Sequence, residues 1–343
     1  MKIYPIFLPF SGCPYRCIYC DQGVNTLQKP VQHEQIIAEV RERIESYRKV
    51  VISKKAPGEI AFYGGTFTAL PEETLKGLIE ILLPVINDGI FTGVRCSTRP
   101  DALNPGSLEI LARLPITTIE LGVQTLDDHL LAVLRRGYTA STVEEAVRKI
   151  RSYGWKVGLQ LMVGVPEENR ELFLKTVKRA IDLRPDVVRL YPLIVLPNTV
   201  LATWYREGRF SPISLKEAIL WCAEALMMFE DAGISVIRIG LQSNPALDGG
   251  HVLAGPYHPA FGYFVRVHKW RMVIDRELEK IDCKGRCFRL KVPGRYLDEC
   301  RGPRQINVRY WMRKRNLASL ILEAMTDTVG TARNRTYSLE EVM

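Results

Sequence analysis

The stretch ITTIELGVQ, residues 116–124, alternates apolar and polar side chains and is typical of a β-strand. Successive side chains of a strand point to opposite faces, so Ile119 and Val123 share one face while Glu120 and Gln124 share the other. A parallel strand that is buried on both faces is normally almost continuously apolar. Polar side chains on the second face are costly unless they bond one another, a trapped water or a ligand. The stretch therefore favours a barrel with a ligand in its mouth.

Five more β-like runs accompany this stretch, and helix-length amphipathic segments separate them. The polar pattern recurs in GLQLMVG, where Gln160 shares a face with Met162 and Gly164. Such alternation predicts an α/β fold of right-handed βαβ units, arranged as a doubly wound open sheet or as a complete or incomplete barrel. The six predicted strands are residues 3–9, 59–64, 93–98, 116–124, 156–164 and 186–193.

The alternation ends after a helix predicted over residues 214–233. A Gly- and Pro-rich segment begins near residue 244, and a basic region follows it that ends in one amphipathic stretch at residues 304–325. We therefore expect a barrel domain at residues 1–245 and a small basic C-terminal extension at 246–343, with RNA or substrate binding as its expected role.

The composition is that of a globular protein, and no apolar run approaches the roughly 18–20 residues that cross a bilayer. We expect a cytoplasmic protein without a membrane partner. Cytosolic thiols stay reduced, so its eight cysteines are expected to be metal ligands, catalytic groups or small core residues rather than disulfides.

Cys13, Cys17 and Cys20 lie together in FSGCPYRCIYCDQG, residues 10–23. A structural zinc site needs four ligands, and no other Cys or His follows before His33. Three thiolates from one loop suit a [4Fe–4S] cluster with one iron left open. The spacing favours that cluster over zinc.

This C-x3-C-x2-C motif after a first strand resembles that of the radical S-adenosylmethionine (SAM) superfamily. The resemblance implies a partial (β/α)6 TIM-like barrel in which the open iron chelates SAM. It also implies reductive cleavage of SAM to a 5′-deoxyadenosyl radical that abstracts hydrogen from a substrate. An electron donor such as ferredoxin or flavodoxin is implied as well, whereas the catalytic residues toward the substrate stay unknown.

Further motifs resemble the SAM-binding segments of that superfamily. FYGGTFT at 62–68 resembles its two-glycine motif, STRPD at 97–101 its polar strand end, and LQLMVGVPEEN its adenine-binding segment. The resemblance also implies that Arg136 pairs with the carboxylate of SAM. The alternative is that Arg136 is an ordinary charge at the C-terminal end of a helix. The residues that the resemblance assigns to SAM are Gly64, Gly65, Thr66, Arg99, Asp101, Glu120, Gln124, Arg136, Gly164 and Val165.

Residues 5–242 resemble, in order, the radical SAM part of the Elongator catalytic subunit, which modifies wobble uridines of tRNA. Oxygen-independent coproporphyrinogen oxidases are more distant relatives. The chain departs from the Elongator pattern because only about 100 residues follow the barrel and they carry no acetyl-CoA loop. We therefore expect no acetyltransferase domain.

The window from residue 283 to 315 holds eleven basic residues and only two acids, Asp298 and Glu299, whereas the rest of the chain is balanced. Local positive charge with Phe288, Tyr296, Tyr310 and Trp311 nearby is typical of RNA contact. The alternatives are a solvated basic face for the charges and the core of a small domain for the aromatic residues. The basic residues are Lys284, Arg286, Arg289, Lys291, Arg295, Arg301, Arg304, Arg309, Arg313, Lys314 and Arg315.

Cys283, Cys287 and Cys300 form a looser trio in the same window, either a zinc or second cluster site or free structural thiols. We expect free thiols, because no clear fourth ligand is present. Three functions follow: a radical SAM enzyme acting on RNA and in particular tRNA, which we favour, a radical SAM enzyme acting on a small molecule, and an RNA-binding iron–sulfur protein without catalysis.

Overall fold

The computed structural model describes residues 2–14, 16–26, 33–325 and 337–342. Its chain divides into two compact units. The first comprises Met1–Ala218 and Met228–Pro259, and the second comprises Ile219–Met227 and Ala260–Met343. Residues 246–259, expected in the C-terminal extension, thus group with the first unit.

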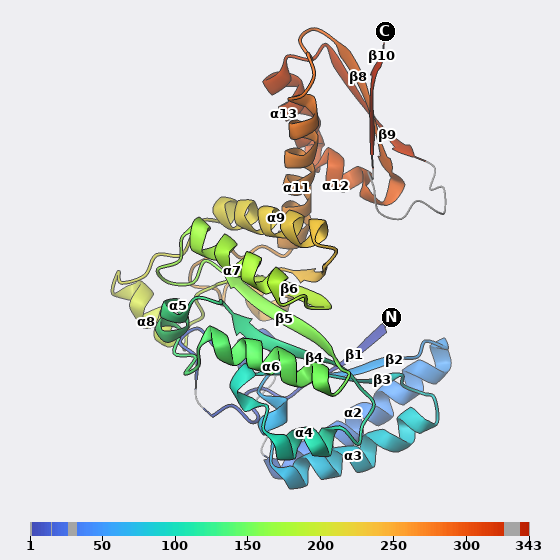
Figure 1. Cartoon of the computed structure of the whole chain (residues 1–343), viewed down its shortest axis with the longest axis vertical. Coiled ribbons are helices and arrows are strands. Elements are labelled where there is room, and N and C mark those ends of the chain that lie inside the picture. The colour runs from blue at the N-terminus through green and yellow to red at the C-terminus, as the bar shows by residue number, and fades with distance from the viewer. Residues whose placement is uncertain (1, 15, 27–32, 326–336, 343) are drawn as a thin grey trace. The chain divides into compact units, whose positions relative to one another are not determined.

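The first unit is built on a parallel sheet of seven strands that follow one another in chain order. All six predicted strands are present, and the predicted partial barrel is confirmed (Figure 1). β1 and β7 form the two edges of this described sheet. The strands are β1 Lys2–Phe7, β2 Gly58–Tyr63, β3 Gly93–Thr98, β4 Ile116–Gln124, β5 Lys156–Val163, β6 Val187–Pro192 and β7 Ser235–Ile239.

The seventh strand is a difference from the six expected. Its sequence, SVIRI, is short and keeps only a partial burial pattern, as is usual for an edge strand. The β-branched residues that follow Gly233 are the feature of the sequence that indicates this strand.

Helices connect the strands, and α2, α3, α6 and α7 flank the curled sheet (Figure 1). Polar side chains begin several of them: Asn169 accepts a hydrogen bond from the backbone of Leu172, and Ser214 forms a capping box with Glu217. The helices between residues 22 and 248 are α1 Gln22–Thr26, α2 His33–Lys54, α3 Glu72–Asn87, α4 Pro105–Leu111, α5 Asp128–Val133, α6 Ala140–Ser152, α7 Arg170–Asp182, α8 Val200–Arg206, α9 Leu215–Asp231, whose middle belongs to the second unit, and α10 Pro245–Asp248.

The second unit packs helices against a three-stranded sheet in the order β10-β8-β9. Trp270, Phe288 and Trp311 lie in its core together with Cys283 and Cys300, so two of the three cysteines in the looser trio are core residues. The described residues group no three metal-ligating side chains here. The elements are α11 Phe261–Leu278, β8 Cys287–Pro293, α12 Leu297–Arg301, α13 Ile306–Arg315, β9 Ser319–Met325 and β10 Ser338–Val342.

The amphipathic stretch at 304–325 is two elements rather than one. α13 ends at Arg315 and is capped by Asn316, whose φ of 51° is left-handed, and β9 begins at Ser319. Asn tolerates this conformation better than most residues, so it can end the helix. None of the helices in the described ranges is both long enough and apolar enough to span a membrane.

Candidate cofactor site

A cavity of about 860 Å³ opens at the carboxyl ends of the barrel strands. That edge is where parallel α/β barrels place their functional groups. The cavity brings together nine of the predicted site residues, which are distant in sequence: Cys13, Cys17, Cys20, Gly64, Gly65, Thr66, Arg99, Gln124 and Arg136.

The cysteine loop is held against the end of β2 by close backbone contacts. The Thr66 N–H donates to the Ser11 carbonyl over 2.8 Å. Gly65 has a φ of 82°, and a Cβ at this position would lie 2.2 Å from the Ser11 oxygen. Thr66 Oγ1 lies 3.3 Å from Cys13 Sγ. The glycine is therefore required by both its conformation and the space around it.

The three thiols face the same cavity and differ in their surroundings. Burial raises the pKa of Cys13, and burial together with the neighbouring thiols raises the pKa of Cys20 to about 12. A metal ligand must lose its proton, so binding of iron here would release protons. Among the described residues, no three ligating side chains are gathered closely enough to enclose an ion, these thiols included. Three thiols in one loop are still the donor set that a [4Fe–4S] cluster needs.

Two arginines lie beside the middle thiol. Arg136 is buried, and its Nη1 donates to Cys17 Sγ over 3.0 Å. Its Nε donates to the hydroxyl of Tyr138 and its Nη2 to the carbonyl of Gly122, over 2.9 and 2.5 Å. These bonds fix a cation against the cysteine loop, where a thiolate or a carboxylate ligand would be stabilised.

Arg99 is the second of these cations. It forms a bidentate pair with Asp101 over 2.9 and 2.8 Å, and its Nη1 lies 3.9 Å from Cys17 Sγ. Arg99 lines the cavity, whereas Asp101 sets the orientation of the guanidinium. Of the two residues predicted in STRPD, Arg99 thus lines the cavity, and Asp101 holds its guanidinium in place.

Glu120 lies behind the cavity wall and is fully buried. Its carboxylate pairs with Arg189 over 2.5 Å and with Arg95 over 3.1 Å. Burial alone would raise the pKa of Glu120, but the two guanidinium groups outweigh burial and hold the pKa below its usual value. Glu120 thus pairs with the arginines of neighbouring strands, and the side chains of Arg95 and Arg189 line the cavity.

This network joins five adjacent strands. Gln160 Nε2 donates to Glu120 Oε2 over 3.3 Å, and Tyr63 donates to Oε1 over 3.3 Å. The sequence analysis missed Tyr63, Arg95 and Arg189. Each of these residues is a polar side chain in a predicted strand, which could have indicated a role. Only the register between the strands shows that the three side chains meet at Glu120.

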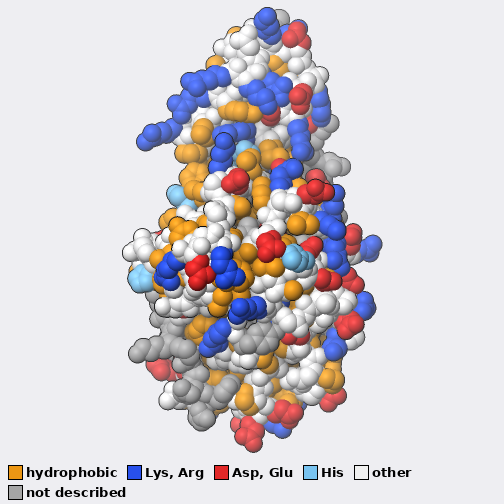
Figure 2. All heavy atoms as spheres, turned by 90° about the vertical axis from the view of Figure 1, so that its left-hand side faces the viewer, with side chains coloured by type: hydrophobic (Ala, Val, Ile, Leu, Met, Phe, Trp, Pro, Cys, Tyr) orange, Lys and Arg blue, Asp and Glu red, His pale blue; other side chains and the backbone are white. Residues whose placement is uncertain are grey.

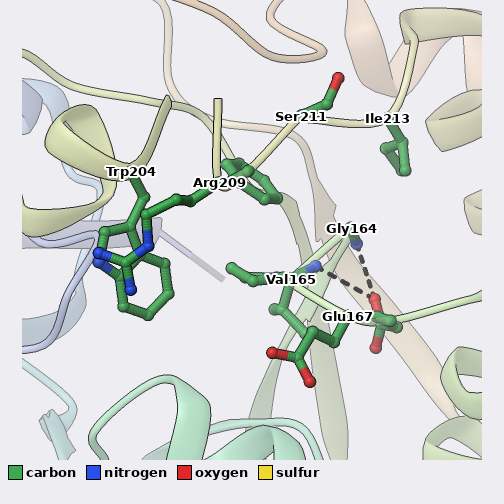
Figure 3. A pocket seen from close by; sticks show the side chains of 10 residues that line it. Gly164, Val165, Glu167, Trp204, Arg209, Ser211 and Ile213 are labelled. Carbon is green, nitrogen blue, oxygen red and sulfur yellow. Dashed lines mark hydrogen bonds between the residues drawn. The ribbon is translucent and has the colours of Figure 1, made fainter. Parts of the chain in front are cut away.

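Gly164 and Val165 line a different, smaller cavity of about 330 Å³ (Figure 3). Their backbone N–H groups donate to Glu168 Oε2 over 2.7 and 3.3 Å. Burial raises the pKa of Glu168 to about 8, and its Oε1 has no hydrogen-bond partner among the described residues. Trp204 and Arg209 also line this cavity, and the guanidinium carbon of Arg209 lies over the Trp204 ring, 5.0 Å from its centroid.

The larger cavity is strongly cationic. Its described lining contains no Asp or Glu and includes six arginines: Arg16, Arg95, Arg99, Arg136, Arg189 and Arg238. Glu120 and Asp101 neutralise some of them from behind. The remaining positive field favours anionic ligands.

Curated relatives share the barrel region at low identity. The tRNA uridine(34) acetyltransferase of Dehalococcoides mccartyi is 28% identical over 231 residues, which cover 58% of this chain and 50% of that protein. The heme chaperone HemW of Bacillus subtilis is 29% identical over 211 residues, covering 61% and 55%. The chain thus spans about half the length of these relatives.

A solved structure supports the fold. The archaeal Methanocaldococcus infernus Elp3 with an N-terminal deletion superposes with a TM-score of 0.57 at 21% identity. The match covers 86% of this chain and 67% of that one.

Two family models also match the chain. The model of the radical SAM superfamily matches residues 7–180, and the model of the Radical_SAM C-terminal domain matches residues 185–275. The first match alone takes in the cysteine loop, the two glycines and β4. The chain therefore belongs to the radical SAM superfamily, as an enzyme whose cofactors are a [4Fe–4S] cluster and SAM.

Proposed function

We propose that this enzyme modifies RNA, with tRNA as the substrate, by abstracting a hydrogen atom from a nucleoside. The observation that carries the proposal is the arginine-lined cavity around the three thiols, because its charge suits an anionic substrate. The relatives named tRNA uridine(34) acetyltransferase support the choice of RNA. The proposal leaves out acetyl transfer, because the similarity spans only about half of those proteins.

In this proposal Cys13, Cys17 and Cys20 hold the cluster and leave one iron for SAM. When bound and reduced, the cluster and SAM supply a carbon-centred radical that takes hydrogen from the substrate. The positive field of Arg136 and Arg99 beside Cys17 stabilises anionic ligands there. The carboxylate of SAM is such a ligand, and a bidentate pair would orient it.

The backbone around Gly64 and Gly65 completes the SAM contacts in this proposal. Both residues have a φ of 82°, so their peptide groups can approach a ligand without a side chain in between. Thr66 and Gln124 also face the cavity. The contacts of Gly164 and Val165 with adenine stay a prediction, since their N–H groups are bonded to Glu168.

Two cellular expectations belong to the proposal. A ferredoxin or flavodoxin supplies the electron, and the enzyme works in the cytoplasm, where thiols stay reduced. We also propose that the basic region at residues 283–315 contributes to RNA binding.

A small anionic molecule is the second candidate substrate. Arg238 favours it, because this guanidinium lines the cavity and, among the described residues, its side chain donates only to the Gly240 carbonyl, over 3.3 Å. A carboxylate of a small molecule would satisfy the remaining donors as well as a phosphate would.

The test asks directly whether the enzyme modifies tRNA. Reconstituted enzyme is incubated anaerobically with SAM, a reductant and unmodified tRNA, and the tRNA nucleosides are then analysed by mass spectrometry. We expect a nucleoside of changed mass that depends on SAM, and the same nucleoside missing from a deletion strain. Turnover of SAM without any change in tRNA, in both experiments, would overturn the RNA proposal and favour the small molecule.

A further inference from the structure

Five of the eleven basic residues of the 283–315 window form ion pairs with described acids that lie outside it. Arg286, for example, pairs with Glu341 over 3.2 Å, and Lys291 pairs with Glu340 over 3.1 Å. Counting charge along the sequence therefore overstates the free positive charge. The other pairs with outside acids are Arg286–Asp282, Arg289–Glu323, Lys314–Asp275, Arg315–Asp275 and Arg315–Glu279.

Arg309 and Arg313 are exceptions, because neither side chain forms an ion pair or hydrogen bond with another described residue. They lie one turn apart on α13 and are exposed. Like charges at this spacing repel each other. Arg313 belongs to the last turn, where the helix dipole favours a cation, but Arg309 does not.

These two side chains line a cavity of about 530 Å³ within the second unit. We call it the α13 pocket and define it as Arg271, Ile306, Arg309, Tyr310, Arg313 and Lys314. Figure 2 shows several Lys and Arg side chains on this unit, at the top of the view.

Arg271 is a third cation of the α13 pocket and comes from α11, outside the basic window. Its Nε donates to Asn307 Oδ1 over 2.8 Å, and its guanidinium lies 4.8 Å from the centroid of the Tyr310 ring. Asn307 is itself buried and donates to the carbonyls of Val267 and Cys300 over 2.8 and 3.0 Å. The guanidinium is therefore held in one orientation.

No carboxylate of the described residues compensates Arg271. Burial lowers the pKa of its guanidinium, as expected for a half-buried cation without an anion beside it. A planar guanidinium with two free Nη groups matches the oxygens of a phosphate. The anion that this pocket lacks within the protein can come from a ligand.

We propose that the α13 pocket binds backbone phosphates of RNA, with Arg271, Arg309 and Arg313 as the contacts. The inference rests on the proposed function, because it takes RNA as the substrate. Guanidinium groups distributed over two helices suit successive phosphates of a chain better than one small anion. The acid-paired basic residues of the same unit contribute little.

The test measures tRNA binding by the full-length holoenzyme over a series of salt concentrations, with fluorescence anisotropy. The double variant Arg309→Gln/Arg313→Gln removes two proposed phosphate contacts. The matched control, Arg286→Gln/Lys291→Gln, removes the same charge from acid-paired positions. We expect the log–log salt slope to become shallower by about 2 in the first variant and to stay close to wild type in the second.

Two outcomes would contradict the inference, and they differ in what else they affect. If wild-type enzyme binds tRNA and the two double variants have the same salt slope as each other, the α13 pocket is not the contact and the proposed function stands. If wild-type enzyme binds no tRNA at low salt, both the inference and the RNA substrate fall. Unchanged melting temperatures and unchanged RNA-free formation of 5′-deoxyadenosine show that the variants are folded.

Discussion

At the scale of single residues, the central feature is a buried carboxylate between two arginines. Glu120 satisfies Arg95 and Arg189 behind the wall of the cofactor cavity. Sequence alternation predicted that Glu120 is turned away from the apolar face of its strand. It could not predict the ion pairs, because these depend on the register between strands. A single strand carries no information about that register.

Replacement of Glu120 by Gln tests this arrangement. It would leave Arg95 and Arg189 without their shared carboxylate, and breaking a buried pair costs about 3–5 kcal/mol. We expect the free energy of unfolding in urea to fall by about that amount. The control is Glu144→Gln, whose pair with Arg179 is more than a third exposed, for which we expect less than about 1 kcal/mol. Equal losses in the two variants would contradict the structural role of Glu120.

Glu168 gives a pH-dependent prediction at the same scale. Burial raises its folded pKa to about 8, whereas an unfolded Glu titrates near ~4.3. Between these values the folded state holds the proton and the unfolded state does not, so this residue lowers stability progressively as pH rises. Below the unfolded pKa the residue has no such effect.

The variant Glu168→Gln imitates the protonated carboxyl and can still accept from Gly164 and Val165. We expect its stability relative to wild type to increase as pH rises from about 5 to about 8. Urea unfolding of both proteins across this range measures the difference. A difference that does not change with pH would show that Glu168 is not protonated in the folded protein.

At the scale of elements, the cysteine loop depends on the turn after β2. The sequence predicted all six leading strands and most of the helices between them, because their periodicity is strong. It missed β7, an edge strand with few buried positions, and it joined α13 and β9 into one segment. Both errors concern elements whose apolar pattern is weak.

Replacement of Gly65 by Ala tests the link between the turn and the loop. The new Cβ would lie 2.2 Å from the Ser11 carbonyl oxygen, so the cysteine loop must shift. We expect the amount of iron bound after reconstitution to fall severely. Gly154→Ala is the control, since Gly154 also has a positive φ of 75° but no atom within 4 Å. It should lose about 1–2 kcal/mol of stability and keep its iron; equal iron content in the two variants would contradict the link.

At the scale of the whole molecule, charge is arranged differently from what the sequence suggested. Five of the eleven basic residues in the window at 283–315 pair with described acids from outside it, and only folding brings these groups together. The cofactor cavity, by contrast, gathers arginines from β3, β6, β7 and the loops around them. The motifs predicted the cofactors because their spacing is local, whereas the distribution of free charge is a property of the fold.

The most direct test of the central claim is iron content together with SAM cleavage in Cys17→Ala. Anaerobically reconstituted wild-type enzyme should bind about four irons per chain and form 5′-deoxyadenosine from SAM when reduced. Cys17→Ala should lose both properties, whereas Cys287→Ala, a partly buried thiol of β8, should retain both. A Cys17→Ala protein that kept its iron and still cleaved SAM would contradict the assignment of the cluster to the cysteine loop.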